Sequence, residues 1–222
     1  MKGIWASLAV ASCFMAVPAM AQDNSGDDFK RVMIRGGFAY LKWDEGASVN
    51  VGGQVVPGGT TRLSNNKGVE IDVSYFLHPN VSVAVAVGVP PTTTLYGAGT
   101  LESAGELGKV TYGPGSATVL YHITGLGPVK PYLGAGVNYT IIFKTKDRLL
   151  QDFKAKDTVG PVLQGGVDIA LNKSFGIYFD AKKIFATSDT TWKLPTPAGL
   201  APGTAKVKLD PLVLNAGVSF RF

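Results

Sequence analysis

The sequence predicts an all-β fold, an eight-stranded antiparallel up-and-down transmembrane β-barrel. Three observations favour it. Eight segments alternate with a period of two, short and long connections follow one another in turn, and no internal apolar run reaches the roughly 20 residues that a spanning helix needs. Only 17% of the 222 residues are charged and 45% are apolar. That composition excludes a disordered chain and leaves a large soluble core or a membrane barrel.

The first 21 residues have the anatomy of a cleaved secretory signal peptide. Lys2 supplies a positive charge, an apolar stretch follows, and Ala19-Met20-Ala21 places small residues where signal peptidase requires them. We therefore expect cleavage after Ala21 and a barrel over residues 22–222. The alternative is a lipoprotein, because residues 10–13 (VASC) resemble a cleavage box that would leave Cys13 acylated.

Cleavage after Ala21 would leave a mature chain without cysteine, because Cys13 is the single one. Disulfides, thiol catalysis and zinc sites built on cysteine are then excluded. The formal net charge of +5 is spread along the sequence, without the clustered basic stripe that nucleic-acid binding needs. We expect no nucleic-acid partner.

The eight expected strands follow one another along the chain, each with one apolar face. The first covers about residues 29–43 and includes VMIRGGFAY, the second is VEIDVSY within 69–76, the third VSVAVAVG (81–88) and the fourth SATVLYHI (116–123). The fifth is LGAGVNYTIIF (133–143), the sixth LQGGVDI (163–169), the seventh FGIYFDAK (175–182) and the eighth LVLNAGVSFRF (212–222). The second face carries charged residues, Asn and Gly, which is typical of a polar lumen.

The connections differ in length from one end of the expected barrel to the other. Short turns lie at 77–80, 124–128 and 171–173, and long segments lie at about 44–68, 90–115, 144–158 and 186–206. Short periplasmic turns and long outer loops are typical of outer-membrane barrels, whereas a soluble sandwich needs no such asymmetry. In the third long loop, Leu149, Leu150 and Phe153 could form one helical turn that packs on the loop or caps the mouth.

Aromatic residues near strand ends are expected in the girdles at the two membrane interfaces. They are Tyr40, Tyr121, Tyr132, Phe143, Phe175 and Trp192. The chain also ends on Phe222, the kind of terminal residue through which barrel-assembly machinery recognises outer-membrane proteins. We expect that machinery and outer-membrane lipid as partners.

Strand direction assigns each inward residue a depth if the N-terminus is periplasmic. Apolar residues are expected to form a collar toward the outside: Leu41, Trp43, Ile142, Val162, Leu209 and Val213. Polar residues are expected nearer the periplasm or at mid-depth: Arg35, Asp72, Asn138, Asp168, Asp180, Lys182 and Arg221. Charges of both signs in a narrow barrel should pair, because an isolated buried charge costs several kcal/mol. Such pairing would plug the lower lumen.

Several segments resemble the OmpW family of outer-membrane proteins. They are KPYLGAGVNYT (130–140), KLDP (208–211) leading into GVSFRF (217–222), GGVD (165–168), and DTT (189–191) before WKL (192–194). The resemblance implies an eight-stranded barrel with a narrow, apolar lumen that passes small hydrophobic molecules.

Together these features favour a hydrophobic solute that enters from the outer loops, is held by the collar and leaves sideways through the wall, because the charged plug blocks its way. Two alternatives stay open. The collar residues could simply pack the top of a closed barrel, or the barrel could anchor a surface interaction or receptor protein that conducts nothing.

An enzyme is not expected, although some eight-stranded outer-membrane barrels are lipid hydrolases or acyltransferases. That chemistry needs a nucleophile and a base with an orienting group, and the two histidines are His78, in a predicted turn, and His122, which neither Ser116 nor Thr118 obviously reaches. Two distant histidines and scattered carboxylates predict no metal site, and the glycines near 97–99 and 113–115 lack a strand–helix context for phosphate. No cofactor is expected.

Overall fold

The computed structural model describes residues 29–44, 46–197 and 199–222. The expected signal peptide and Cys13 lie outside these residues and stay predictions. Nearly all of the described chain is β-strand, apart from one short 3-10 helix, η1 (Glu102–Ala104). Within this part of the chain, no helix is long and apolar enough to cross a membrane.

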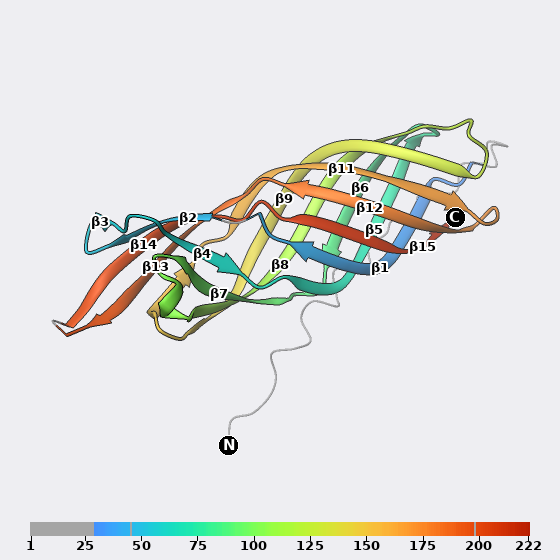
Figure 1. Cartoon of the computed structure of the whole chain (residues 1–222). Helices are drawn as coiled ribbons and strands as arrows, with labels where there is room; N and C mark the ends of the chain where they lie inside the picture. Colours follow the sequence, from blue (N-terminus) through green and yellow to red (C-terminus); the bar gives the residue numbers. More distant parts are fainter. Residues whose placement is uncertain (1–28, 45, 198) are drawn as a thin grey trace, which may run out of the picture.

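Eight strands form a closed antiparallel ring, which confirms the predicted barrel (Figure 1). They are β1 (Val32–Lys42), β5 (Asn66–His78), β6 (Val81–Gly88), β8 (Glu106–His122), β9 (Val129–Asp147), β11 (Thr158–Ala170), β12 (Phe175–Ile184) and β15 (Leu212–Arg221). Each strand pairs with its neighbours in the sequence, and β15 pairs with β1 to close the ring. The short turns and both ends of the described chain lie at one end, which is the periplasmic end in barrels of this kind.

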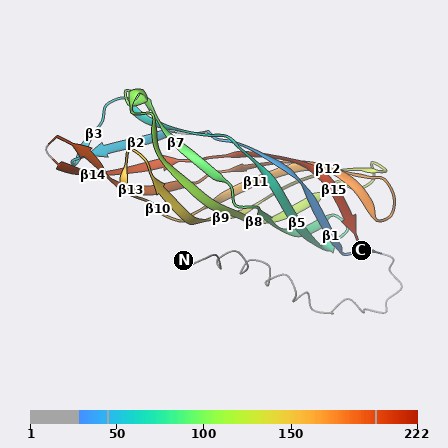
Figure 2. The ribbon, with the colours of Figure 1, turned by 90° about the horizontal axis from the view of Figure 1, so that it is seen from below.

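The long connections at the other end are themselves largely strands, which we call the outer extension. It contains β2 (Gly46–Val51), β3 (Gln54–Val55), β4 (Gly59–Leu63), β7 (Thr92–Gly99), β10 (Gln151–Ala155), β13 (Thr187–Thr196), β14 (Gly199–Lys208) and η1. Strand β7 pairs with the outer part of β8, and β4 pairs with β7, so these two strands extend the barrel sheet. The other strands form a second sheet in the order β10-β13-β14-β2-β3. Figures 1 and 2 show this extension prolonging the barrel along its axis.

The outer extension has an apolar core of its own. Its buried members are Val49, Leu95, Leu107, Leu150, Phe153, Trp192, Ala205 and Val207. The helical turn expected around residues 149–153 is therefore wrong, because β10 pairs with β13 there and turns Leu150 and Phe153 into this core.

Two of the expected girdle aromatics also face inward. Trp192 is 7% exposed because β13 packs in the outer extension, above the barrel, and Tyr132 is 3% exposed because it points into the lumen. The other four, Tyr40, Tyr121, Phe143 and Phe175, are exposed on the outer wall, as a lipid interface requires.

A wall glycine makes room for Tyr132. Gly166 of β11 pairs with Tyr132 of β9, and a Cβ added at Gly166 would lie 2.5 Å from the Tyr132 hydroxyl oxygen. The ring of Tyr132 therefore lies across the glycine, inside the barrel. A side chain at position 166 would have to displace the ring.

Candidate functional site

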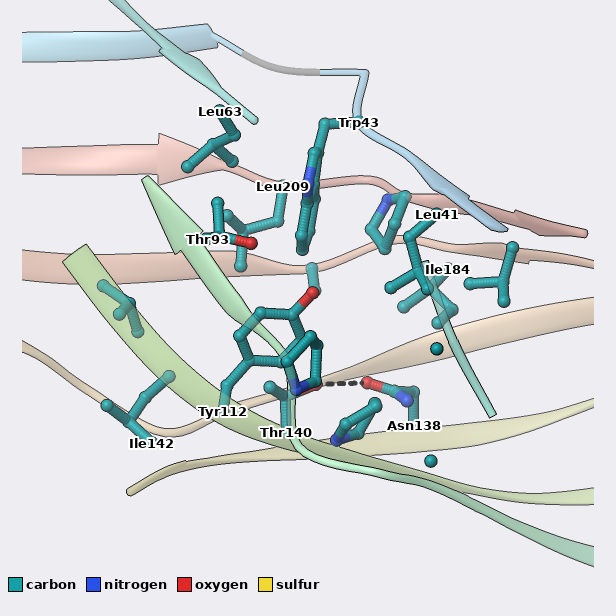
Figure 3. Close-up of a pocket in the computed structure, with 18 of the residues that line it drawn as sticks. Leu41, Trp43, Leu63, Thr93, Tyr112, Asn138, Thr140, Ile142, Ile184 and Leu209 are labelled. Carbon is teal, nitrogen blue, oxygen red and sulfur yellow. Dashed lines mark hydrogen bonds between the residues drawn. The ribbon is translucent and has the colours of Figure 1, made fainter. Parts of the chain in front are cut away.

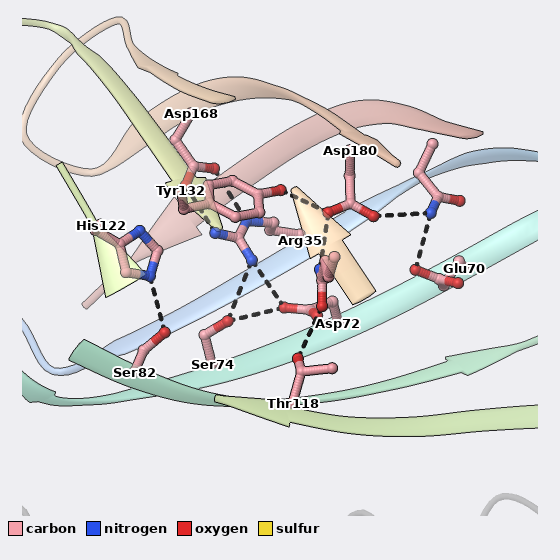
Figure 4. A network of polar contacts seen from close by, with 12 residues as sticks. Arg35, Glu70, Asp72, Ser74, Ser82, Thr118, His122, Tyr132, Asp168 and Asp180 are labelled. Carbon is pink, nitrogen blue, oxygen red and sulfur yellow. Dashed lines mark hydrogen bonds and ion pairs between the residues drawn. The ribbon is translucent and has the colours of Figure 1, made fainter. Parts of the chain in front are cut away.

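The barrel interior has two layers of different chemistry. The lower layer, toward the periplasmic end, is the polar network, and the upper layer is the apolar chamber. The polar network consists of Arg35, Glu70, Asp72, Ser74, Thr118, Tyr132, Gln164, Asp168, Asp180, Lys182 and Asn215 (Figure 4).

Arg35 lies at the centre of the first half of the network. Its guanidinium donates to both oxygens of Asp168, from Nε at 3.0 Å and from Nη2 at 2.7 Å. Its Nη1 donates to Asp72 at 3.1 Å and to the hydroxyl of Ser74 at 3.2 Å. The guanidinium also lies 4.7 Å from the centre of the Tyr132 ring. Arg35 is 1% exposed, so a fork of hydrogen bonds to two carboxylates compensates the burial of its charge.

Lys182 is the cation of the second half. It contacts Glu70 and lies 3.0 Å from Asp180. Asn215 donates to both of these carboxylates, at 3.2 and 3.3 Å. Tyr132 donates to Asp180 at 2.8 Å and thereby connects this half to the half around Arg35.

The wall on the far side adds neutral partners to the network. Gln164 donates to Asp180 at 2.7 Å and accepts from Thr118 at 2.8 Å. The network therefore reaches from β8 through β11 and β12 to β1 and β5, across the whole lumen. Buried polar groups connected in this way hold a fixed arrangement.

The apolar chamber lies directly above the network and has a cavity volume of about 90 Å³. Glu70 and Lys182 belong to its floor, and its wall and roof are almost entirely apolar. Leu41, Val162 and Val213 belong to one buried cluster with Ile184, and Trp43 and Ile142 pack against that cluster. Leu209 also lines the chamber (Figure 3).

Trp43 and Tyr112 both line the chamber and lie next to each other (Figure 3). Their rings meet edge to face, with centres 5.7 Å apart. The Trp43 indole donates to the carbonyl of Ser64 at 3.0 Å, and the Tyr112 hydroxyl lies 3.1 Å from the side-chain amide of Asn66. Each polar atom is thus bonded to the wall, and the apolar faces of both rings remain toward the chamber.

One side wall of the chamber lacks a regular ladder. The pairing of β6 with β8 ends at Val87 and Gly115. Beyond it, the amide of Val89 turns to the carbonyl of Val69 on β5, and Pro90, Pro91 and Pro114 have no N–H to donate. Gly88, Val89, Pro91 and Pro114 all line the chamber.

The structure places most of the residues singled out in the sequence in these two layers. Among the collar residues, Val162 is fully buried and packs behind the chamber surface. Among the polar residues, Asn138 lies in the chamber wall, where it donates to Gly115, and Arg221 lies at the periplasmic rim below the network. Glu70 and Tyr132 also belong to the network, although Glu70 was not among the expected polar residues and Tyr132 was expected in an interface girdle. Both follow from the period-two pattern, since Glu70 shares a face with Asp72 and Tyr132 with Asn138.

His122 points into the lower lumen, and its Nε2 lies 2.8 Å from the hydroxyl of Ser82. This serine was not considered in the sequence, because it lies on another strand. Ser82 has no exposed surface, and His122 packs between the rings of Phe76 and Tyr132. A serine nucleophile needs access to its substrate, and Ser82 has none. The arrangement of Ser82 and His122 is that of side chains packed in the lumen.

The fold and the layered lumen define the class: a small eight-stranded β-barrel protein of the outer membrane. The comparison with known families identifies the family within this class, because the OmpW family matches residues 28–222. The chain belongs to the OmpW family, and it resides in the outer membrane, with its apolar wall in lipid.

Relatives and solved structures agree with this assignment. The chain is 38% identical over 186 residues to the dibenzothiophene metabolism operon protein PahQ of Pseudomonas aeruginosa, covering 84% of this chain and 86% of PahQ. It is 31% identical over 179 residues to the outer membrane protein AlkL of Ectopseudomonas oleovorans, covering 81% and 76%. The crystal structure of the outer membrane protein OprG from Pseudomonas aeruginosa has the same fold, with a TM-score of 0.81 at 22% identity over 87% of this chain and 96% of OprG.

Proposed function

We propose that the protein gives small hydrophobic molecules a path from the outer extension into the apolar chamber and out through the barrel wall into the bilayer. The observation that carries this proposal is the apolar chamber, which lies on a charged floor and beside a wall with an interrupted ladder. The relative PahQ, named for a dibenzothiophene metabolism operon, supports an apolar and aromatic class of solute.

The outer extension supplies the first part of the path. A second apolar cavity lies in its core, between residues such as Leu107, Leu150 and Trp192. Leu95, Thr190 and Val207 line both this cavity and the chamber, so the two share a wall. An apolar solute would lose water in the extension and stay dehydrated on its way down.

The polar network is an argument against an exit for the solute at the periplasmic end. A hydrophobic solute that crossed it would have to separate Arg35 and Lys182 from their carboxylates without replacing those hydrogen bonds. Leaving a buried charge unpaired costs several kcal/mol. Sideways movement past apolar side chains has no such cost.

The interrupted wall between β6 and β8 is where we place the exit. Opening it breaks few backbone hydrogen bonds, because the three prolines have no N–H to donate. The bond to be broken there is the one that the Tyr112 amide donates to the carbonyl of Pro91 at 3.2 Å. The outward residues Val85 and Val87 of β6 are 52% and 39% exposed, which suits contact with lipid chains. Val89, just beyond β6, lines the chamber and is also 63% exposed. A solute leaving there would enter the bilayer directly.

Uptake of N-phenyl-1-naphthylamine tests the path, because this small apolar dye brightens in a bilayer. The purified barrel is placed in vesicles whose outer leaflet contains lipopolysaccharide, and the initial rate is measured. We expect a rate above that of empty vesicles, and a loss of that gain in Leu41→Lys and Trp43→Lys variants of equal heat-modifiable folding. Equal rates in wild type and variants would remove the chamber from the path.

The lateral exit has its own variant. Gly88→Leu places a side chain at the interrupted wall, where an added Cβ already lies 3.2 Å from Cγ of Pro114. Gly36→Leu is the matched control, because an added Cβ there meets nothing within 4 Å. We expect Gly88→Leu to slow dye uptake and Gly36→Leu to leave it unchanged. Normal uptake by both would place the exit elsewhere.

A closed barrel that anchors a receptor is the second candidate, and the ordered outer extension with its own core favours it. Folded barrels that raise dye uptake no more than empty vesicles do would support this candidate over the path.

We also propose that the terminal strand is the recognition element for barrel assembly. Phe222 exchanges backbone hydrogen bonds with Val32, at 2.9 and 3.0 Å, and its ring is 51% exposed beside Phe220. Deletion of Phe222 should slow insertion by the purified assembly machinery more than it slows spontaneous folding into lipid.

A further inference from the structure

We propose that the periplasmic mouth of the barrel is a binding site for a phosphate group, carried by an inner-leaflet lipid or free in the periplasm. The site is the periplasmic basic pocket, whose cationic side chains are Lys30, Lys130, Lys173 and Arg221. It lies below the polar network and does not depend on the path proposed above.

The four cations of this pocket outnumber the acidic groups that line it. Of the residues lining it, one is acidic, Asp168, and both its oxygens already accept hydrogen bonds from Arg35. Among the described residues, no ion pair involves Lys30, Lys130, Lys173 or Arg221. The pocket thus gathers four cations, whereas the network just above it pairs each cation with carboxylates.

Arg221 is held in place by several contacts and still has an unpaired hydrogen-bond donor. Its guanidinium carbon lies 3.9 Å from the centre of the Phe76 ring and 4.9 Å from that of Phe29, and its Nε donates to the carbonyl of Lys30 at 2.8 Å. Its Nη2 is buried and has no hydrogen-bond partner among the described atoms. A buried donor without a partner is costly, so the arrangement is explained if a ligand supplies the acceptor.

Neighbouring groups extend the set of donors. The Lys30 ammonium is anchored by the hydroxyl of Ser174 at 2.6 Å, and the backbone of the turn from Leu171 to Ser174 forms the adjacent rim. A planar guanidinium together with several ammonium groups suits the oxygens of a phosphate. Basic pockets at the membrane surface bind lipid headgroups by the same chemistry.

The test is calorimetric titration of the folded barrel in a non-ionic detergent with two probes, dihexanoyl phosphatidylglycerol and inorganic phosphate. Dihexanoyl glycerol, which lacks the phosphate, is the control ligand for apolar binding. We expect saturable binding of at least one phosphate probe and none of the control ligand. Binding of the lipid alone identifies a headgroup site, and binding of both probes identifies a general phosphate site.

Variants assign the binding to this pocket. Arg221→Gln should weaken it at least about tenfold, the size expected for a lost charge-assisted hydrogen bond, and Lys173→Gln, in an exposed turn, should weaken it less without a risk to folding. Arg62→Gln is the matched control, because Arg62 also lies over an aromatic ring, that of Tyr96, but in the outer extension. Heat-modifiable mobility verifies that each variant is folded.

Two results would overturn the proposal. One is that neither phosphate probe binds, or that a probe binds wild type and both pocket variants with the same affinity. The other is binding that appears only in an Asp27→Asn/Asp28→Asn variant, which would mean that these carboxyl groups, adjacent to Phe29 in the sequence, already satisfy the pocket.

Discussion

The lower and upper halves of the lumen are lined by the same strands, yet they are built on opposite principles. In the polar network nearly every side chain has a charged or hydrogen-bonded partner, and Arg35 alone bonds two carboxylates and a serine. In the apolar chamber the side chains surround a cavity of about 90 Å³ and make apolar contacts with one another. A few residues along each strand separate a region of paired charges from a region of apolar side chains around a cavity.

This difference shows what each layer contributes. Paired charges gain little net stability over an apolar core, but they strongly disfavour any arrangement that separates them. An incompletely filled apolar space sacrifices packing energy and leaves room for a ligand. The network therefore keeps the lower lumen closed, and the chamber leaves apolar space in the upper lumen.

The largest effect should come from removing the centre of the network. Arg35→Met leaves Asp72 and Asp168 as buried carboxylates without a cation, and we expect the free energy of unfolding to fall by about 3–5 kcal/mol. Urea unfolding in lipid vesicles, followed by heat-modifiable mobility, measures it. Arg62→Met in the outer extension is the control. A loss below about 1 kcal/mol would mean that water compensates the carboxylates in the lumen.

Truncation in the chamber should cost less. Leu41→Ala removes a buried side chain, but it faces a space that is already partly empty, so we expect about 2 kcal/mol, the lower end of the usual range. The same unfolding assay applies, and dye uptake should persist because the chamber only widens. A cost as large as that of Arg35→Met would contradict the distinction between the two layers.

A polar atom in the chamber wall should matter still less. Tyr112→Phe removes the hydroxyl beside the Asn66 amide, a buried contact, and we expect a loss of about 1 kcal/mol. Tyr40→Phe removes a comparable hydroxyl that accepts from Asn65 at the exposed surface, and should leave stability unchanged. Equal losses in both variants would show that burial of the bond is unimportant.

The smallest effect is expected from an ion pair at the surface of the outer extension. The Lys193 ammonium, 2.6 Å from Asp152, holds the pKa of that carboxyl below its usual value. Because the folded pKa is lowered, the stabilisation exists above the unfolded pKa and is lost as pH falls through the folded one. Lys193→Gln should raise the pKa of Asp152 in a carbon-13 NMR titration and leave unfolding unchanged. A strong pH-dependent destabilisation would mean that the extension relies on this pair.

Much of this architecture could be predicted from the sequence, because a membrane barrel enforces a strict period of two. That period predicts the eight strands and puts Arg35, Asp72 and Asp168 inside. It equally implies Tyr132, which shares the inward face of Asn138, although its position near a strand end suggested a girdle. The partnership of Arg35 with Asp168 could not be predicted, since it depends on how the first and sixth strands face each other across the ring.

The outer extension was less predictable. Residues 186–206 are rich in Thr, Pro and Gly, which are typical of loops, yet they form the β13–β14 hairpin. Its stability comes from Trp192 and Val207 packing against side chains of β2, β7 and β10. Such contacts between segments far apart in sequence leave no local pattern.

The residues of the polar network come from strands far apart in the sequence, and this constrains how the barrel is assembled. Arg35 stands on the first strand of the ring, and its carboxylate partners stand on the second and sixth strands. While the ring is open, Arg35 lacks Asp168, and a partly inserted chain would present this charge to hydrocarbon at a cost of several kcal/mol. Insertion and ring closure should therefore occur as one concerted event, with unclosed intermediates held at the membrane surface.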